Sequence, residues 1–207
     1  ARARASAKII AVTGSAGKTG SKEMLATAFA ALGKTHASQK SYNNHVGVPL
    51  TLALMPRDTQ FAVIEMGMNH AGELSALTKQ VRPHIAMITT IEPAHIEHFG
   101  TIEAIADAKA EIFEGLSADS KSPPVAILNH DNIMFARLKA AAEKIAGVRI
   151  LAFGEDDGTD TRLTDCTLHS DSSKITADVS GQVVKLKLNI PGRHIAQNAL
   201  GVLRVIK

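Results

Sequence analysis

The feature that most constrains this chain is a glycine-rich loop between an apolar run and a helical pattern. Residues 8–13 read Lys-Ile-Ile-Ala-Val-Thr, which is typical of a short buried strand. Residues 14–19 read Gly-Ser-Ala-Gly-Lys-Thr, and residues 18–32 place apolar side chains at helical spacing before Gly33. A strand, a glycine loop ending in Lys-Thr and a helix form the P-loop arrangement, which favours an α/β fold.

The loop predicts a binding site for the phosphates of ATP and for Mg²⁺. The glycines let successive backbone N–H groups point at one anion, and the helix N-terminus adds positive potential there. We expect Lys18 to reach the β- and γ-phosphates and the Thr19 hydroxyl to bind Mg²⁺. The residues expected to hold the nucleotide here are Gly14, Ser15, Ala16, Gly17, Lys18 and Thr19.

The spacing of this loop departs from the usual G-x-x-x-x-G-K-[ST] pattern. The first glycine of that pattern would fall at Val12, and here it is Gly14 instead, so the loop is shorter than the standard form. A plain glycine turn with a surface lysine and a capping threonine therefore remains an alternative at this point.

Strand and helix patterns alternate through residues 1–160. Further strands are expected at 35–38, 60–66, 84–89, 125–128 and 148–153, and further helices at 50–55, 71–81, 101–116 and 132–145. This alternation predicts a P-loop NTPase-like, mostly parallel sheet with helices on both faces.

The pattern changes after residue 160. Residues 161–190 alternate polar and apolar side chains, and Gly181-Gln182 lies between two such runs, which predicts an antiparallel hairpin added to the parallel core. Residues 191–207 contain an apolar helix, expected at 195–206, and the sequence stops inside it. We therefore expect residues 1–207 to be one domain, and a fragment of a longer protein.

Composition excludes several classes of protein. With 45% hydrophobic and 21% charged residues the chain is typical of a globular domain, and we expect a monomer. Aromatic residues make up only 3% and the net charge is +3, which argues against a nucleic-acid partner. Arg2 and Arg4 are expected in a solvated terminus.

A single cysteine, Cys166, suits a reducing cytoplasmic compartment. No apolar run is long enough for membrane insertion.

Two polar residues stand where strands are expected to end. Glu65 closes the strand at 60–66 and should emerge at the carboxyl edge of the sheet, where open α/β sheets bind ligands. There it could hold Mg²⁺ directly or through water, with a solvated strand end as the alternative. His95 follows the strand at 84–89, and a structural role is its alternative. With His98 it could also contribute to a zinc site, although further ligands of the usual kind are not nearby.

Several ordered motifs resemble the central ATPase domain of the Mur ligases. They cover nearly the whole chain: residues 13–19, Asn-Asn-His-Val-Gly-Val-Pro-Leu-Thr-Leu at 43–52, Glu-Met-Gly-Met-Asn-His-Ala-Gly-Glu-Leu at 65–74, Ala-His-Ile-Glu-His-Phe-Gly at 94–100, Ala-Lys-Ala-Glu-Ile at 108–112, Asn-His-Asp at 129–131 and Pro-Gly-Arg-His at 191–194. The double Asn and the Glu-Met-Gly segment are most similar to the branch that adds D-alanyl-D-alanine.

The resemblance implies a reaction in peptidoglycan-precursor synthesis. ATP would phosphorylate the terminal carboxylate of a UDP-N-acetylmuramoyl-tripeptide, and the amine of D-Ala-D-Ala would attack the acyl phosphate to give an amide. The work of such a site is charge neutralisation around anions. Complete Mur ligases also have an N-terminal UDP-sugar domain and a C-terminal domain for the amino substrate. We expect both to be absent here, so the isolated chain should bind nucleotide weakly and not ligate.

The resemblance also implies catalytic residues, namely Lys18, His95 and Lys109. It assigns Glu65 and His95 to Mg²⁺ binding, and it matches Lys109 to the lysine that Mur ligases carry as a carbamate, suited to a second Mg²⁺. Forming a carbamate requires a neutral amine, so Lys109 would need a depressed pKa. From the sequence alone, Lys109 is a helix lysine whose default place is the solvated surface.

Four amide and carboxylate residues are implied to lie around the nucleotide. The resemblance places Asn44 and Asn198 near the adenine, and Asn129 and Asp131 near the nucleotide. Ile195 stands where relatives have Asn after the last His, which puts a side-chain contact from that position in doubt.

Three other functions compete with this interpretation. A related amide ligase such as a folylpolyglutamate synthase would share the motifs. A nucleotide-binding module inactive in isolation would share the loop. A P-loop switch GTPase needs a guanine-reading Asn-Lys-x-Asp, which residues 129–131 do not supply.

Overall fold

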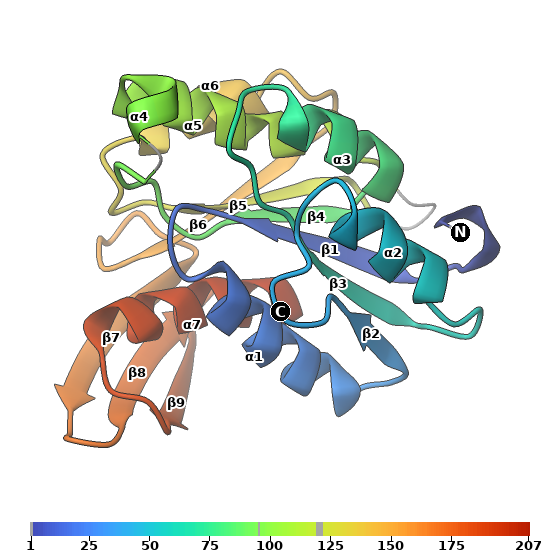
Figure 1. The fold of residues 1–207 in the computed structure, drawn as a ribbon. Helices are drawn as coiled ribbons and strands as arrows, with labels where there is room; N and C mark the ends of the chain where they lie inside the picture. The colour runs from blue at the N-terminus through green and yellow to red at the C-terminus, as the bar shows by residue number, and fades with distance from the viewer. Residues whose placement is uncertain (1, 95, 119–121) are drawn as a thin grey trace.

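The strands of this chain join into one sheet in the order β2-β3-β1-β4-β5-β6-β7-β8-β9. The computed structural model describes residues 2–94, 96–118 and 122–207 (Figure 1). The strands are β1 (Lys8–Thr13), β2 (Thr35–Ala37), β3 (Phe61–Glu65), β4 (Ile85–Ile88), β5 (Val125–Asn129), β6 (Arg149–Gly154), β7 (Thr161–Leu168), β8 (Ser173–Val179) and β9 (Gln182–Leu188). The predicted α/β class with a mostly parallel sheet is confirmed.

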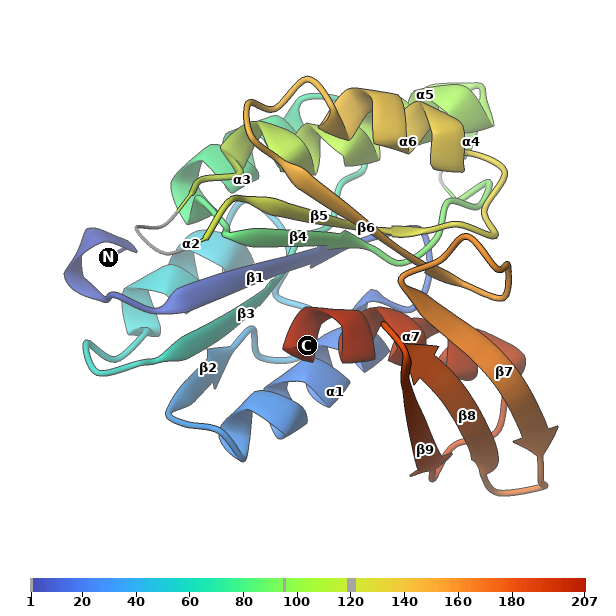
Figure 2. The ribbon, with the colours of Figure 1, turned by 180° about the vertical axis from the view of Figure 1, so that it is seen from behind.

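Helices cover both faces of the sheet (Figures 1 and 2). One face carries α2 (Gly47–Leu54), α3 (Glu73–Val81), α5 (Ile102–Ala110) and α6 (Phe135–Ala142), and the other carries α1 (Lys18–Ala30) and α7 (Arg193–Ile206). Shorter turns are η1 (Arg2–Arg4), α4 (Ile96–Phe99) and η2 (Glu111–Gly115).

The apolar run of β1 explains why both faces need a cover. Successive side chains of a strand point to opposite faces. Ile9 and Ala11 accordingly join the hydrophobic cluster under α2, α3, α5 and α6, whereas Ile10 and Val12 join the cluster under α1 and α7. All four side chains are buried, so the strand is central in the sheet.

The strand order places the glycine-rich loop at the middle of the carboxyl edge. β1 pairs in parallel with β3 on one side and β4 on the other, which makes its end the point where the chain switches direction across the sheet. The Ser15 N–H donates to the Thr90 carbonyl at 2.8 Å, and the Met66 N–H donates to the Val12 carbonyl at 2.9 Å. The loop is therefore fixed against the end of β4, and the last residues of β1 are fixed against the end of β3.

The predicted antiparallel addition continues the main sheet. β7 pairs with β6 in parallel through Phe153 and Thr161, and then pairs with β8 in the antiparallel direction. The hairpin between β8 and β9 forms as predicted, with Gly181 at a positive φ of 85°. No helix in the described parts of the chain is long and apolar enough to cross a bilayer.

Two expectations about local structure were wrong. The helix expected over 101–116 divides into α5 and the 3₁₀ turn η2, because η2 packs on α3: the Thr78 hydroxyl donates to the Ile112 carbonyl at 2.7 Å, and the Glu111 carboxylate accepts from the Gly72 and Ser75 N–H groups at 2.6 and 3.0 Å. The N-terminal Arg2 is not simply solvated. It is half-buried, and its Nε donates to the Val81 carbonyl at 3.0 Å.

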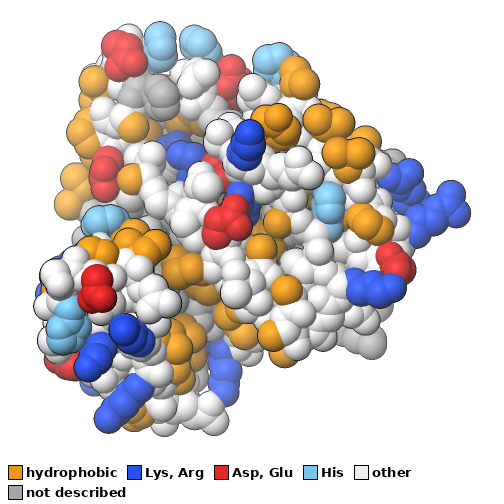
Figure 3. Space-filling view, turned by 60° about the horizontal axis from the view of Figure 1, so that its bottom comes forward, with side chains coloured by type: hydrophobic (Ala, Val, Ile, Leu, Met, Phe, Trp, Pro, Cys, Tyr) orange, Lys and Arg blue, Asp and Glu red, His pale blue; other side chains and the backbone are white. Residues whose placement is uncertain are grey.

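Charges of both signs are spread over the face in Figure 3. Lys and Arg side chains gather at the lower left and at the right edge of this view, and acidic side chains lie among the other residues between these two places. On the antiparallel part of the sheet, Lys174, Lys185 and Lys187 line one surface of β8 and β9.

Candidate nucleotide and metal site

Two glycines allow the loop after β1 to approach its neighbours closely. Gly14 has a φ of +149° and Gly17 a φ of +80°. A Cβ on Gly14 would lie 1.9 Å from the Thr89 Oγ1, and a Cβ on Gly17 would lie 2.2 Å from the Asn198 Nδ2. The second contact joins the loop to α7, which comes from the far end of the sequence. Both positions therefore exclude a side chain.

Lys18 begins α1 and extends over the loop. Its Nζ donates to the Gly14 carbonyl at 2.8 Å and lies 3.3 Å from the Ser15 carbonyl. Burial lowers the pKa of Lys18, and the carboxylate of Glu65 opposes that shift. Thr19 follows in the first turn and is exposed. A cation and a hydroxyl thus stand at the positive end of a helix, beside the backbone N–H groups of the loop.

Glu65 lies at the end of β3, as the sequence indicated, but it is fully buried and not solvated. Its Oε1 accepts a hydrogen bond from the Asn43 Nδ2 at 2.7 Å. Its Oε2 is buried and has no hydrogen-bond partner among the described residues. A buried carboxylate oxygen without a partner is costly, and a hard cation would satisfy it. The donor set around the loop therefore fits Mg²⁺.

Lys109 is the least expected member of the site. It lies in α5 and is only 2% exposed. Burial, and then repulsion from the Lys18 ammonium, lower the pKa of Lys109 to about 7. Within the described parts of the chain, no acid offsets this and no hydrogen bond to its Nζ is found. A large fraction of the amine is therefore neutral near pH 7, which is the condition that a carbamate requires.

The second metal candidate, His95, lies outside the described residues. His98 stands next to Glu97 with 3.9 Å between Nε2 and Oε1, and its ring lies 5.0 Å from that of His70. Among the described residues, the group with metal-type side chains close together is His130, Asp131 and Asp156, which does not include His98. Within the described residues, the zinc alternative gains no third ligand beside His98 and His70.

A cavity of about 340 Å³ lies between the loop, the ends of β4 and β5 and the start of α7. It is lined by Ala16, Gly17, Thr90, Glu92, Asn129, His194, Gln197 and Asn198. Both Asn129 and Asn198 are buried, at 7% exposure each. Asn129 donates to the Thr89 carbonyl at 3.2 Å and accepts from the Asp131 N–H at 3.0 Å. Its amide thus fixes the turn after β5 against the end of β4.

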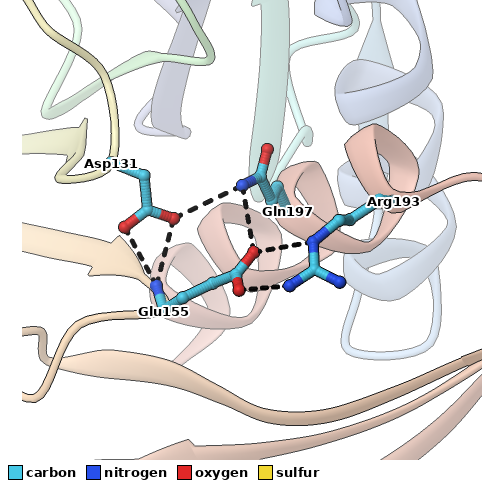
Figure 4. Close-up of polar contacts among 4 residues, drawn as sticks. All are labelled: Asp131, Glu155, Arg193 and Gln197. Atoms are coloured by element: carbon cyan, nitrogen blue, oxygen red, sulfur yellow. Dashed lines mark hydrogen bonds and ion pairs between the residues drawn. The ribbon is translucent and has the colours of Figure 1, made fainter.

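Asp131 lies beside this cavity and accepts hydrogen bonds from Glu155 and Gln197 (Figure 4). Its two carboxylate oxygens accept from the Glu155 N–H at 3.0 Å each, and one accepts from the Gln197 Nε2 at 3.3 Å. Glu155 in turn forms a two-point ion pair with Arg193, with 3.0 Å between the Arg193 Nε and Oε1. This network joins the loops after β5 and β6 to the first turn of α7.

Sequence reasoning missed three members of that network and also Asn43. Arg193 belongs to the Pro-Gly-Arg-His motif and Asn43 to the double Asn, so both stood in quoted motifs without an assigned role. Glu155 and Gln197 gave no separate signal.

The structure does not bring Asn44 to Asn198. The Asn44 Oδ1 accepts from the N–H groups of Val46 and Gly47 at 3.1 and 2.9 Å, and so caps the start of α2. Asn44 lines a different cavity, of about 450 Å³, which shares no lining residue with the one at Asn198. A place for both side chains at one adenine is therefore not supported by this geometry.

Comparison with known proteins gives the family. The model of the Mur ligase middle domain matches residues 12–206. The chain belongs to the Mur ligase family. It is 34% identical to the UDP-N-acetylmuramoyl-tripeptide–D-alanyl-D-alanine ligase of Rickettsia prowazekii, over 99% of this chain and 45% of that protein. It is 34% identical to the ligase of the same name from Escherichia coli, over 96% of this chain and 43% of that protein. The chain therefore spans less than half the length of these relatives.

Solved structures agree with this membership. A crystal structure of MurF from Acinetobacter baumannii superposes with a TM-score of 0.90 at 33% identity, covering 99% of this chain and 43% of that one. MurF ligase from Thermotoga maritima in complex with ADP gives 0.83 at 24%, covering 99% and 46%. Folylpolyglutamate synthase from Mycobacterium tuberculosis, complexed with ADP and AMPPCP, gives 0.72 at 18%, covering 98% and 55%. The last two show a shared fold.

Proposed function

We propose that this chain is the ATP-binding part of a ligase that adds D-Ala-D-Ala to a UDP-N-acetylmuramoyl-tripeptide through an acyl phosphate. The observation that carries the proposal is the buried, uncompensated Lys109, close enough to the P-loop Lys18 for the two charges to interact. A simple phosphate-binding loop has no need for a second, neutral amine at this place. The similarity to ligases named for this reaction supports the same substrate class.

The chemistry assigned to these residues is charge neutralisation at the γ-phosphate. The loop N–H groups and Lys18 bind and orient the phosphates, so that the substrate carboxylate meets phosphorus in line. Thr19, Glu65, Lys109 as a carbamate and His95 would hold Mg²⁺, two ions in all; bound there, Mg²⁺ supplies Lewis-acid stabilisation of the transferring phosphoryl group. For the carbamate, the neutral Lys109 amine attacks CO₂, an N–C bond forms and one proton leaves.

The cavity at Asn129 and Asn198 is the proposed place of the adenine. It adjoins Gly17 of the loop, so a base in it would be continuous with phosphates on the N–H groups. Two buried side-chain amides offer donors and acceptors for the edge of the base. Solved relatives in complex with ADP or AMPPCP support nucleotide binding by this fold.

For the whole protein, we further propose that it recognises both substrates, acts in the cytoplasm and serves cell-wall synthesis. Because the 207 residues cover less than half of these relatives, experiments on them test nucleotide binding, and ligation is proposed for the whole protein. A folylpolyglutamate synthase remains a relative of lower similarity, at 18% identity against 33% for MurF.

Calorimetric titration of ATP and Mg²⁺ tests the binding role on the chain itself. We expect saturable binding that Lys18→Met weakens about tenfold or more, because a charge-assisted contact with the phosphates is lost, and no heat of binding with GTP at the same concentrations. The ligase role is tested by joining the chain to the remaining domains of a relative and measuring phosphate release. Release that needs both UDP-N-acetylmuramoyl-tripeptide and D-Ala-D-Ala is expected. Release with a folate and glutamate in their place would overturn the assignment.

A further inference from the structure

A second buried lysine, Lys22, has no part in the function proposed above. It lies on α1, one turn after Lys18, and its side chain is entirely buried. Its Nζ donates to the Ser38 carbonyl at 2.9 Å and to the Lys40 carbonyl at 2.9 Å, and it pairs with the Glu23 Oε1 at 2.7 Å. An ammonium has three N–H donors, so each donor has an acceptor.

The two carbonyls belong to the segment between β2 and α2, which we call the 38–43 segment. This segment holds Glu65 from two sides. The Ser38 Oγ accepts from the Glu65 N–H at 3.0 Å, and the Asn43 Nδ2 donates to the Glu65 Oε1 at 2.7 Å. The Asn43 carbonyl also accepts from the Gly67 N–H at 2.8 Å, so the segment is anchored to the chain beyond β3.

The backbone of the 38–43 segment contains one strained residue. Lys40 has a φ of 47°, in the left-handed region that side chains other than Gly, Asn and Asp rarely adopt. Its carbonyl is one of the two that Lys22 binds. A strained conformation persists where its surroundings determine it, and the hydrogen bond from the buried Lys22 ammonium acts directly on the strained residue.

We propose that Lys22 is a positioning residue that orients the Glu65 carboxylate toward the cation accompanying the nucleotide phosphates. This inference rests on the proposed function, in which Glu65 binds Mg²⁺. Because Lys22 and Lys18 share one helix, the element that carries the phosphate loop also fixes the 38–43 segment. Asn43 then occupies one oxygen of Glu65 and leaves Oε2 for the cation.

The test compares nucleotide binding with and without Mg²⁺ in the 207-residue chain. The variants are Lys22→Met and Asn43→Ala, with Glu65→Gln as reference. ADP affinity is measured by calorimetry at saturating Mg²⁺ and in EDTA, together with the Mg²⁺ concentration at half effect. We expect both variants to raise that concentration about tenfold or more, as loss of groups that orient a metal ligand does. ADP affinity in EDTA should stay within about twofold, because the loop N–H groups and Lys18 are untouched.

Matched controls separate positioning from general loss of structure. Lys34→Met removes an exposed lysine that pairs with Asp58, and it should leave both affinities unchanged. Glu23→Gln keeps an oxygen acceptor for Lys22 and should also behave like the parent chain. If Lys22→Met fails to fold, Asn43→Ala keeps the buried lysine and its three acceptors and tests the same link.

A second readout needs no metal. In the Mg²⁺-free chain, amide hydrogen exchange at Glu65 and Gly67 should be faster in Lys22→Met, since their acceptors lie on the 38–43 segment. Unchanged exchange and unchanged Mg²⁺ dependence in both variants would overturn the inference. If Glu65→Gln itself has no effect on Mg²⁺ dependence, the metal role of Glu65 in the proposed function fails instead.

Discussion

Replacement of Lys109 by methionine should make the chain more stable, and by an amount that depends on pH. The lysine is 2% exposed, and the change keeps most of its volume while removing the charge. Its pKa falls from the ordinary 10.5 to about 7 in the folded chain. Between these two values the unfolded chain binds a proton that the folded chain has released. Stability of the parent chain should therefore rise with pH across this window, and this contribution is absent in the variant.

The magnitude follows from the same two pKa values. Below pH 7, the buried charge of Lys109 lowers the free energy of unfolding by about 5 kcal/mol. Above pH 10.5 this cost is gone, because the lysine is neutral in both states. Over the accessible interval from about pH 6.5 to about pH 9.0, the parent chain should gain about 2.5 kcal/mol relative to Lys109→Met. The variant should therefore be the more stable protein at the acid end by several kcal/mol, with a smaller advantage at the alkaline end.

Urea unfolding of both chains at a series of pH values measures this difference. The buffers must be depleted of CO₂, because a carbamate would change the charge of the same amine. Lys139→Met, which removes an exposed lysine of α6, controls for the loss of one positive charge. A stability difference between parent and Lys109→Met that stays constant with pH would refute the reasoning, because the lysine would then titrate alike in both states. Added bicarbonate at alkaline pH should stabilise the parent chain and not the variant.

Three further predictions concern the nucleotide site. Lys18→Met should lower ATP affinity about tenfold or more by calorimetry, because a charge-assisted contact with the phosphates is lost. Its urea stability should change little, because burial already disfavours the charge. Gly17→Ala should destabilise the chain by about 1–3 kcal/mol in the same assay and abolish ATP binding, since φ is +80° and the Cβ would lie 2.2 Å from the Asn198 amide. Arg193→Ala breaks an exposed ion pair and should leave urea stability nearly unchanged, yet weaken ATP binding by loosening the first turn of α7. Arg137→Ala breaks a comparable exposed pair on α6 and should leave ATP binding unchanged.

The parallel core could be predicted because its elements carry local signals. The run at 8–13 is apolar on both sides of the strand, which only a sheet covered on both faces can bury. The glycines of the loop marked the turn where the chain leaves the sheet, and their close contacts with Thr89 and Asn198 explain why no side chain is tolerated. Pairing partners are not local. The sequence indicated that 161–190 form strands, but not that β7 continues the main sheet through Phe153.

The candidate site was predictable only in part, for the same reason. Lys18 and Thr19 stand in a recognisable loop, and Glu65 closes a recognisable strand. Burial of a helix lysine depends on what packs around it, and no spacing in the sequence signals it. Likewise, the double Asn drew attention to Asn44, whereas the structure gives the contact with Glu65 to Asn43.

The two buried lysines, Lys22 and Lys109, differ in how their charges are satisfied. Lys22 is satisfied by two carbonyls and a carboxylate, so the fold is able to bury an ammonium with all of its donors matched. Lys109 is buried almost as completely, and among the described residues it has no hydrogen-bond acceptor, while the Lys18 ammonium repels its charge. A fold that needed only packing at this position would gain stability from methionine or leucine. An amine kept buried at such a cost, within reach of the Lys18 ammonium that also interacts with Glu65, fits the metal-binding role proposed for Lys109.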